Sequence, residues 1–218
     1  MITNKNCILR LSRYKSALAR LKYLGFVKVF SDNLADAVGV TAAQVRKDFS
    51  IFAISGNKKG GYQVDALIAR LNEILGKDRT QNVIVVGAGH IGAALMQYRG
   101  FEQEGMKIVA GFDIDPARFA PDSLIPVYSL EELKNFVSKN DIRIGIIAVP
   151  DIAAQRVLDI MVSAGIKGVL NFAPIQLRVQ GDCVINNINV GLELENLIYY
   201  VNAARKAKKR IDNEDEDI

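Results

Sequence analysis

Three glycines, at positions 87, 89 and 92, form the spacing G-x-G-x-x-G directly after the apolar run 83–86. Valine and isoleucine in such a run favour a buried strand, and the apolar residues 93–96 favour a helix after the glycines. In this arrangement the first glycine permits a tight turn, the second lets the backbone approach a pyrophosphate, and the third lets the helix pack closely on the strand. The N–H groups at the start of the helix would face the phosphates. The segment predicts a dinucleotide site formed by Gly87, Ala88, Gly89, His90, Ile91 and Gly92.

An acidic residue is expected at the end of the second strand of such a domain, where it accepts hydrogen bonds from ribose hydroxyls. Asp113 follows the strand predicted over 107–112 and is the first candidate, with Asp115 in the next turn as the alternative. A carboxylate here would repel the 2′-phosphate of NADP, which favours NAD. His90, the single histidine, either touches the pyrophosphate or faces solvent, and the residues leave both readings open.

Two later strand ends are apolar where a dehydrogenase would need a proton donor or acceptor. Residues 147–150 and 171–174 favour a dry pocket for a nicotinamide ring, with Ala148, Val149, Pro150, Asn171 and Phe172 as candidate contacts. We therefore predict that the chain is not an enzyme. Cys7 and Cys183 stand alone in the sequence, so no metal site and no disulfide are predicted.

Charge is distributed unevenly along the chain. Residues 1–80 carry 14 Lys and Arg against 6 Asp and Glu, whereas residues 81–218 carry 14 against 18. This asymmetry favours two domains and a polyanionic partner for the first, nucleic acid before a membrane. The sequence has no apolar run of about 18 residues and no apolar core of a signal peptide, so the expectation is a soluble cytoplasmic protein without a membrane partner.

The basic first part has apolar residues at helical spacing over 8–24, 31–38 and from position 41 onward. Ser31 is expected to cap the second helix, and Thr41 with Gln44 fits a capping box for the third. In the third helix Val45, Phe49 and Phe52 would face the core. The side chains expected nearer to solvent are Ala42, Ala43, Gln44, Arg46, Lys47 and Ser50.

These helices match a helix-turn-helix, whose second helix enters the major groove of DNA. There Gln44 would pair with adenine, Arg46 with guanine, and Lys47 with a phosphate. The glycine-rich basic segment 55–62 predicts a wing that touches the DNA backbone or minor groove. The candidate DNA contacts are Thr41, Ala43, Gln44, Arg46, Lys47, Lys58 and Lys59. An ordinary helical bundle with a basic loop is the alternative.

The fold class is therefore α/β, a winged-helix domain followed by a Rossmann-type domain with a parallel sheet. Strands are expected over 107–112, 142–149 and 168–171, and helices over 64–75, 130–137 and 153–164, with a linker over 76–81. The predicted parts are a DNA-binding domain over 1–80, a nucleotide domain over 81–190, a helix over 191–210 and a disordered acidic tail over 211–218. The apolar face of the last helix either docks on its own domain or crosses to a second protomer.

On these residues the chain resembles the Rex family of bacterial redox-sensing transcriptional repressors. The segments that carry the resemblance are 41–48, 60–62, 87–92, 171–174, 193–197 and 199–200. The resemblance implies a homodimer in which each C-terminal helix is inserted into the partner, with NADH and NAD+ competing for one site and NADH releasing operator DNA. It also implies that Tyr98, in the first Rossmann helix, lies near the nicotinamide and the subunit interface.

Two positions depart from the family pattern: His90 stands where many members have Arg, and Asn189 where some are acidic. Two other functions fit the same motifs. One is an NAD-dependent dehydrogenase with a basic accessory domain, and the other is a DNA-binding protein whose nucleotide fold has lost its ligand.

Overall fold

The structure is a computed structural model that describes residues 4–57, 60–179 and 181–216. It divides into two compact units. The first comprises Met1–Gln81 and Glu102–Met106, and the second comprises Asn82–Phe101 and Lys107–Ile218. The short segment Glu102–Met106 groups with the first unit because Glu104 accepts hydrogen bonds from Lys15 at 2.7 Å and Lys77 at 2.6 Å. The boundary predicted after residue 80 had assigned this segment to the nucleotide domain.

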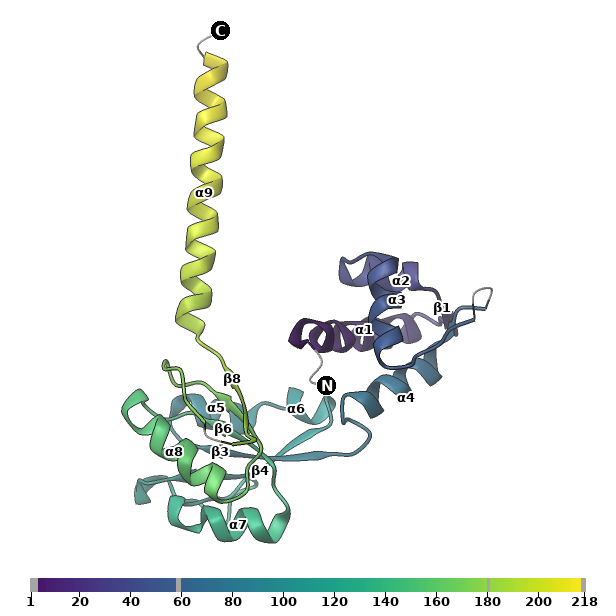
Figure 1. The fold of residues 1–218 in the computed structure, drawn as a ribbon. Helices are drawn as coiled ribbons and strands as arrows, with labels where there is room; N and C mark the ends of the chain where they lie inside the picture. The colour runs from purple at the N-terminus through teal and green to yellow at the C-terminus, as the bar shows by residue number, and fades with distance from the viewer. Residues whose placement is uncertain (1–3, 58–59, 180, 217–218) are drawn as a thin grey trace. The chain divides into compact units, whose positions relative to one another are not determined.

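Within the described residues, the first unit contains four helices and one strand pair around an apolar core. Figure 1 labels α1 to α4 and β1 of this unit. Its elements are α1 (Lys5–Tyr23), β1 (Lys28–Val29), α2 (Ser31–Val38), α3 (Ala42–Ile51), β2 (Tyr62–Gln63) and α4 (Val64–Ile74). The residues buried at its centre include Leu11, Tyr14, Leu18, Leu34, Val45, Phe49, Leu67 and Leu71. These residues recur at helical spacing, which is why the periodicity located the four helices.

The caps of α2 and α3 differ in part from expectation. Ser31 is the buried first residue of α2 rather than its cap, because the N–H of Phe30 is held by the Asn33 side chain at 2.8 Å. Thr41 caps α3 as predicted, accepting from the N–H of Gln44 at 3.1 Å. The Gln44 side chain does not complete a capping box and instead donates to Asp48, one turn further along.

The predicted wing contains a narrow antiparallel ladder. β1 pairs with β2, and a bridge between Asn57 and Gly61 extends the hairpin beyond β2. Gly61 has φ 65°, in the left-handed region that glycine adopts without strain. The two lysines predicted for the tip, Lys58 and Lys59, lie outside the described residues.

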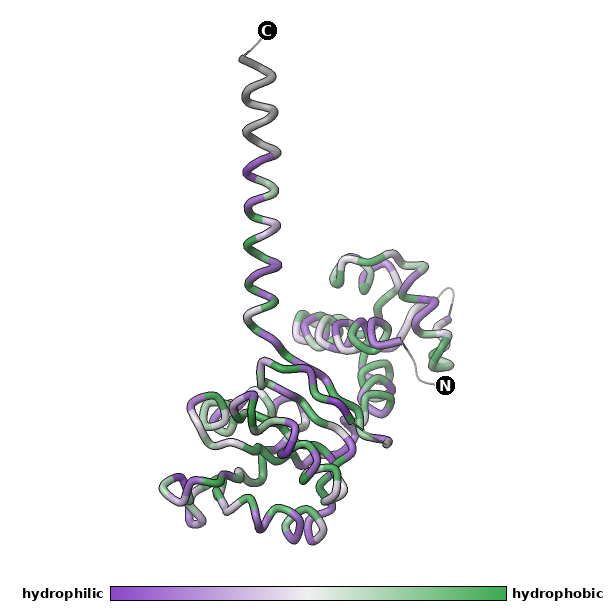
Figure 2. Tube along the Cα trace, turned by 60° about the vertical axis from the view of Figure 1, so that its left-hand side comes forward, coloured by the Kyte–Doolittle hydropathy of each residue, from purple (hydrophilic) through white to green (hydrophobic). Residues whose placement is uncertain are grey.

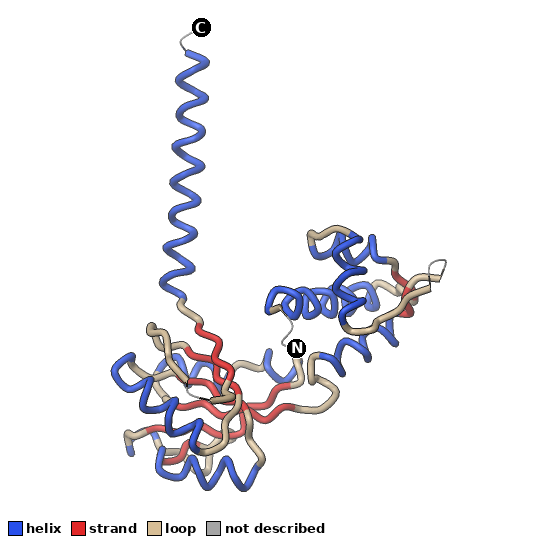
Figure 3. Tube along the Cα trace, viewed as in Figure 1, coloured by secondary structure: helices blue, strands red, loops and turns tan. Residues whose placement is uncertain are grey.

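Within the described residues, the second unit contains a six-stranded sheet with the order β5-β4-β3-β6-β7-β8. Figure 3 shows its strands in red with helices in blue beside them. The strands are β3 (Gln81–Val86), β4 (Met106–Asp113), β5 (Val127–Ser129), β6 (Ile144–Ile147), β7 (Gly168–Asn171) and β8 (Val184–Asn187). Its helices are α5 (His90–Gln97), α6 (Gly100–Gln103), α7 (Leu133–Asn140), α8 (Asp151–Ser163) and α9 (Val190–Glu216), with 3₁₀ turns η1 (Pro116–Arg118) and η2 (Leu130–Glu132). The pairs β4–β5, β3–β6, β6–β7 and β7–β8 are parallel. This is the strand order of a Rossmann sheet.

The nucleotide domain confirms the predicted alternation of strands and helices, although the bounds of most elements differ by up to three residues. The strand expected over 142–149 is confined to β6, and β5 and β8 add two edge strands that periodicity did not predict. Edge strands of three or four residues are too short to give a period-2 signal. Buried residues of α7 and α8, such as Leu133 and Leu158, pack with Ile84 and Phe112 of the sheet.

The last helix, α9, continues to Glu216. The prediction of a disordered tail over 211–218 is therefore wrong for residues 211–216, and residues 217–218 lie outside the described residues. After Gly191 the sequence has no Gly or Pro and is rich in Ala, Lys, Arg and Glu, which favour helix. Figure 2 shows hydrophobic and hydrophilic residues interspersed along its coloured part. Its exposed apolar residues, each more than half exposed, are Val190, Leu192, Leu194, Leu197, Ile198, Tyr199, Tyr200 and Val201. Within the described residues, no helix is long and apolar enough to cross a membrane.

Candidate functional site

A cavity of about 600 Å³ opens at the ends of β3 and β6, the point where the strand order of the sheet reverses. Ligands of open α/β sheets bind at such a switch point, and this volume suits a small organic ligand. Its polar or charged lining side chains are His90, Asp113, Asp115 and Arg118. Its other lining residues are Val86, Gly87, Gly89, Ile91, Ile114, Leu130, Ala148, Val149, Pro150, Ala153, Val157, Phe172 and Pro174.

The glycine turn leaves no room for side chains at two of its three glycines. Gly87 is buried with φ 99°, and a Cβ there would lie 2.7 Å from the carbonyl carbon of Ala148. A Cβ at Gly92 would overlap the carbonyl oxygen of Gly87. At Gly89 the nearest atom to such a Cβ is Nη1 of Arg118, 2.9 Å away at the end of a flexible side chain. The roles predicted for the first and third glycines, a tight turn and close packing of the helix, are therefore present.

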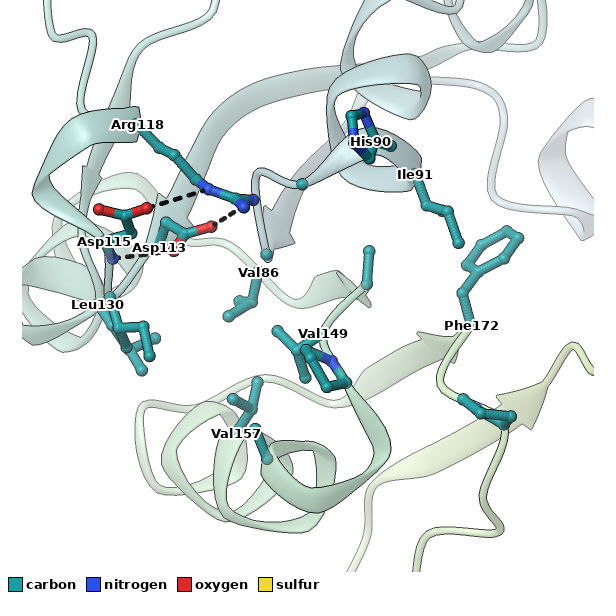
Figure 4. Close-up of a pocket in the computed structure, with 17 residues that line it drawn as sticks. Val86, His90, Ile91, Asp113, Asp115, Arg118, Leu130, Val149, Val157 and Phe172 are labelled. Atoms are coloured by element: carbon teal, nitrogen blue, oxygen red, sulfur yellow. Dashed lines mark hydrogen bonds and ion pairs between the residues drawn. The ribbon is translucent and has the colours of Figure 1, made fainter.

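Charged side chains gather at one end of the cavity (Figure 4). Asp113, which is 8% exposed, accepts from the N–H of Ala88 at 2.7 Å and from that of Asp115 at 3.0 Å. Arg118 places Nη1 3.6 Å from Asp113 and Nε 3.5 Å from Asp115. The sequence argument against NADP assumed that a 2′-phosphate would meet a carboxylate without an arginine, and Arg118 corrects that premise. Two carboxylates still outnumber one guanidinium, so this end remains unfavourable for a second phosphate.

The opposite end of the cavity is apolar. Figure 4 shows Ile91 and Phe172 at the far side of the cavity from Asp113 and Arg118. Pro150 and Pro174, from the loops after β6 and β7, also line the cavity. A site with a charged end and an apolar end can orient a ligand that has a hydroxylated, polar half and a flat, uncharged half.

Nine of the residues predicted to contact a cofactor line this cavity, namely Gly87, Gly89, His90, Ile91, Asp113, Ala148, Val149, Pro150 and Phe172. Ala88, Gly92, Asn171 and Tyr98 are not among the lining residues. The N–H of Ala88 is used by Asp113, and Asn171 is fully buried. Tyr98 was expected within a helix, but α5 ends at Gln97 and the Tyr98 side chain is 61% exposed. Its ring contacts Phe101 edge-on, with centroids 5.1 Å apart.

Arg118 was not predicted to line the cavity, and neither were Val86, Ile114, Leu130, Ala153 and Val157, whereas Pro174 lies in the segment 171–174 predicted to form the apolar pocket. Arg118 ends the 3₁₀ turn η1, which starts at the proline of the Asp115-Pro116 dipeptide. An arginine shortly after the second strand is a usable signal, because that region selects between NAD and NADP. The sequence does not mark the unpredicted apolar lining residues as part of a site, since residues of these types occur equally in any buried core.

The second candidate site is the exposed face of α3. Val45, Asp48 and Phe49 are buried, whereas Arg46 and Lys47 are exposed. Thr41, Ala43 and Ser50 are also exposed. Ala42 and Gln44, which were expected near solvent, and Phe52, which was expected in the core, are all half-buried. The helix therefore presents small and basic side chains outward, a composition that suits the major groove. Gln44 uses one of its two amide hydrogens for Asp48, at 2.8 Å.

Asp48 is the centre of a buried polar cluster that ties α3 to α1. The side chain is 1% exposed and accepts from Arg10 Nε at 2.6 Å, Arg10 Nη2 at 2.7 Å, Tyr14 Oη at 3.0 Å, Gln44 Nε2 at 2.8 Å and Cys7 Sγ at 3.4 Å. Burial alone would raise the pKa of Asp48, but hydrogen bonds, foremost from Arg10, outweigh burial and lower that pKa. Burial and Asp48 together raise the pKa of the Cys7 thiol, so this cysteine is held in its neutral form.

Comparison with known proteins gives matches over both units. Residues 5–50 match a family model described as "Putative DNA-binding protein N-terminus", and residues 78–175 match one described as "CoA binding domain". The chain is 43% identical over 205 residues to a redox-sensing transcriptional repressor Rex of Desulforamulus reducens, covering 92% of this chain and 95% of the relative.

Among solved structures, the chain is similar to RSP, a Rex-family repressor, at 36% identity. The complex of RSP with beta-NAD+ and operator DNA superposes with a TM-score of 0.88, covering 96% of this chain and 97% of that chain. The complex with beta-NADH gives a TM-score of 0.83, covering 96% and 99%.

Proposed function

Because this chain belongs to the Rex family of redox-sensing transcriptional repressors, we propose that α3 binds operator DNA and that NADH in the cavity beside β3 releases it. The chain is a regulator rather than an enzyme, and NADH and NAD+ are its ligands, in line with the names of its relatives and the complexes of RSP. The observation that carries the proposal is the presence, in one chain, of a glycine-turn cavity and a helix with outward-facing Arg46 and Lys47.

The lining residues of the cavity have the chemistry that the parts of a dinucleotide require, which supports the proposal. Asp113 and Asp115 stand where the adenosine ribose hydroxyls donate hydrogen bonds. The N-terminus of α5, beginning at His90, offers N–H groups and the positive end of a helix dipole to the pyrophosphate. Gly89 lets the backbone come close to that group. In this proposal Arg118 moves away from Gly89 when the pyrophosphate arrives and remains beside the carboxylates.

The apolar end distinguishes the two redox states. The reduced nicotinamide ring is neutral, whereas the oxidised ring has a positive charge that would lose its hydration in the cavity. Ala148, Val149 and Phe172 have no charge to compensate for that loss, so they favour the neutral ring. Since a ligand shifts a conformational equilibrium only through its differential affinity, NADH must bind the DNA-free arrangement more tightly than the DNA-bound one. By reciprocity, operator DNA weakens NADH binding by the same factor.

We infer that the active species is a homodimer held together by α9. The exposed apolar residues of that helix, which include Leu194, Leu197 and Val201, repeat with helical spacing. Exposure of such an apolar face to water is unfavourable and is typical of a protein–protein interface. A second copy of the chain can cover them through a twofold interface, with each α9 inserted into its partner. Twofold symmetry also matches an operator with two half-sites, about 34 Å apart on the duplex.

The proposed DNA contacts are sorted by chemistry. Arg46 reads a base edge, Lys47 contacts a phosphate, and Thr41 and Ala43 let α3 approach the groove. Gln44 contributes its second amide hydrogen and its carbonyl, with Asp48 fixing its orientation. Lys58 and Lys59 of the wing add salt-dependent contacts to the backbone. Because its target is bacterial operator DNA, the proposed place of action is the cytoplasm.

The test is a titration of the full-length chain against duplexes selected on the nucleotide-free protein from a random pool. We expect NADH to weaken DNA binding by about tenfold or more, and NAD+ to weaken it much less, as measured by anisotropy of the labelled duplex. Arg46→Ala should relax base preference by about 1–3 kcal/mol at one position, whereas NADH binding, followed by its own fluorescence, should not change. Equal release by NADH and NAD+ would refute redox sensing, and no DNA selection at all would refute the repressor.

A further inference from the structure

A buried amide joins two parts of the nucleotide domain, the apolar end of the cavity and the start of α9. Asn171 is the last residue of β7, is 0% exposed and lies outside the cavity lining. Its Nδ2 is 2.8 Å from the carbonyl oxygen of Ile175 and 2.9 Å from Oδ1 of Asn187. A third acceptor, the carbonyl of Ala173, is 3.2 Å from Nδ2, so three oxygens share two hydrogens.

On the cavity side, Asn171 fixes the loop that follows β7. Its Oδ1 accepts from the N–H of Ala173 at 2.9 Å, and its Nδ2 holds the carbonyls on both sides of Pro174. Phe172 and Pro174, which alternate with these anchored residues, line the apolar end of the cavity. Because the loop is held at three points by one side chain, its position depends on that side chain.

On the other side, Asn171 reaches the chain that leads into α9. It pairs with Asn187 in the register of β7 and β8, and its carbonyl accepts from the N–H of Ile188 at 2.8 Å. The next residue, Asn189, caps α9 by accepting from the N–H of Leu192 at 3.1 Å through Oδ1. Asn187, which is bonded to Asn171, is therefore only two residues from Asn189, which caps α9.

We propose that Asn171 is a positioning residue that makes the apolar wall of the cavity and the base of α9 move as one unit. The inference rests on the proposed function, in which the nicotinamide ring lies against Phe172 and the two copies meet at α9. When ligand binding shifts that wall, the hydrogen bond between Asn171 and Asn187 transmits the shift to α9. Without that bond, the cavity still binds NADH, but within the described residues only backbone hydrogen bonds join the wall to α9, so occupancy of the cavity biases the arrangement of the dimer less.

The experiment alters the receiving end of this link and leaves the cavity wall anchored. Asn187→Ala removes the one acceptor of the Asn171 amide that lies on β8, whereas Asn187→Asp keeps an oxygen acceptor at the same place. Asn140→Ala is the matched control, because the Asn140 amide also donates to an oxygen of the same domain, the Phe136 carbonyl at 2.8 Å, away from the cavity. For each full-length variant, the coupling factor is the Kd for the selected duplex with saturating NADH divided by the Kd without nucleotide.

We expect the coupling factor of Asn187→Ala to fall about fivefold or more toward 1, while Asn187→Asp and Asn140→Ala stay within about twofold of wild type. NADH fluorescence should give a Kd for the DNA-free Asn187→Ala protein within about threefold of wild type. A coupling factor that Asn187→Ala leaves intact, or that Asn140→Ala lowers equally, overturns the inference. If the wild-type protein itself shows no release by NADH, the proposed function fails first, and the two failures are told apart by that measurement.

Discussion

Replacing Asp48 with Asn should loosen the recognition helix α3 while leaving Arg46 and Lys47 unchanged, although Gln44 loses its contact with the carboxylate. The carboxylate is 1% exposed and accepts from Arg10, Tyr14, Gln44 and Cys7, so an amide in its place presents hydrogens to donors and leaves the guanidinium without a charge partner. Removing one partner of a buried ion pair costs about 3–5 kcal/mol. The Arg10 side chain is 24% exposed and can recover some hydration, which places the expected loss near the lower figure, about 3 kcal/mol.

Hydrogen exchange read by mass spectrometry measures this loss locally in the full-length chain. A loss of about 3 kcal/mol in the opening free energy corresponds to roughly a hundredfold loss of amide protection in α1 and α3. Amides of β3 and β6 should keep their protection, because they belong to the other unit. Asp36→Asn is the matched control, since Asp36 is an exposed aspartate of the neighbouring helix α2. A loss of less than about fivefold in α3 would refute the assignment of this cluster as the attachment of the recognition helix.

The same pair of proteins gives a pH test. Because the pKa of Asp48 is lowered in the folded state, its stabilising contribution is fully present above the unfolded pKa of about 3.9 and is lost as the pH falls through the lower folded value. The difference in protection between wild type and Asp48→Asn should therefore be constant near neutral pH and shrink below about pH 4. A difference that grows on acidification would contradict this sign.

Two further predictions concern the cavity. Gly92→Ala should abolish detectable NADH fluorescence enhancement, because its Cβ would overlap the Gly87 carbonyl and force the turn open, whereas DNA binding without nucleotide should persist; an unchanged NADH affinity would show that the turn can relax. Asp113→Asn should lower the preference for NADH over NADPH by about tenfold, because one carboxylate fewer then lies beside Arg118, which can pair with a 2′-phosphate. The measurement is the Kd of each nucleotide for the wild type and for the variant.

The local signals in the sequence predicted most of the nucleotide site. The glycine spacing, the acid at the end of the second strand and the apolar strand ends each depend on residues close in sequence, so their roles follow from local geometry. Arg118 was missed because its importance comes from the fold of the turn after Asp113, which brings it over Gly89. Asn171 was predicted to contact the cofactor directly, because nothing local shows that Asn187 of β8 accepts from its amide and that Ile188, just after β8, donates to its carbonyl.

The polar support of α3 was also beyond sequence reasoning. Asp48 lies 34 to 41 residues from Tyr14, Arg10 and Cys7, and no periodicity links positions so far apart. Edge strands β5 and β8 were missed because three or four residues cannot show alternation. The full length of α9 was missed because the acidic block 212–217 predicted disorder, although the glutamates within it are good helix formers.

The exposed first part of α9 also affects how this protein should behave at low concentration. With 27 residues at about 1.5 Å each, the helix is roughly 40 Å long, and apolar side chains along its first part are more than half exposed. If a second copy is what shields them, mass action makes folding and assembly a single equilibrium, and the melting temperature climbs as the solution becomes more concentrated. A cell with few copies would then hold a reservoir of separated chains, unable to span two half-sites whatever the state of its nicotinamide pool.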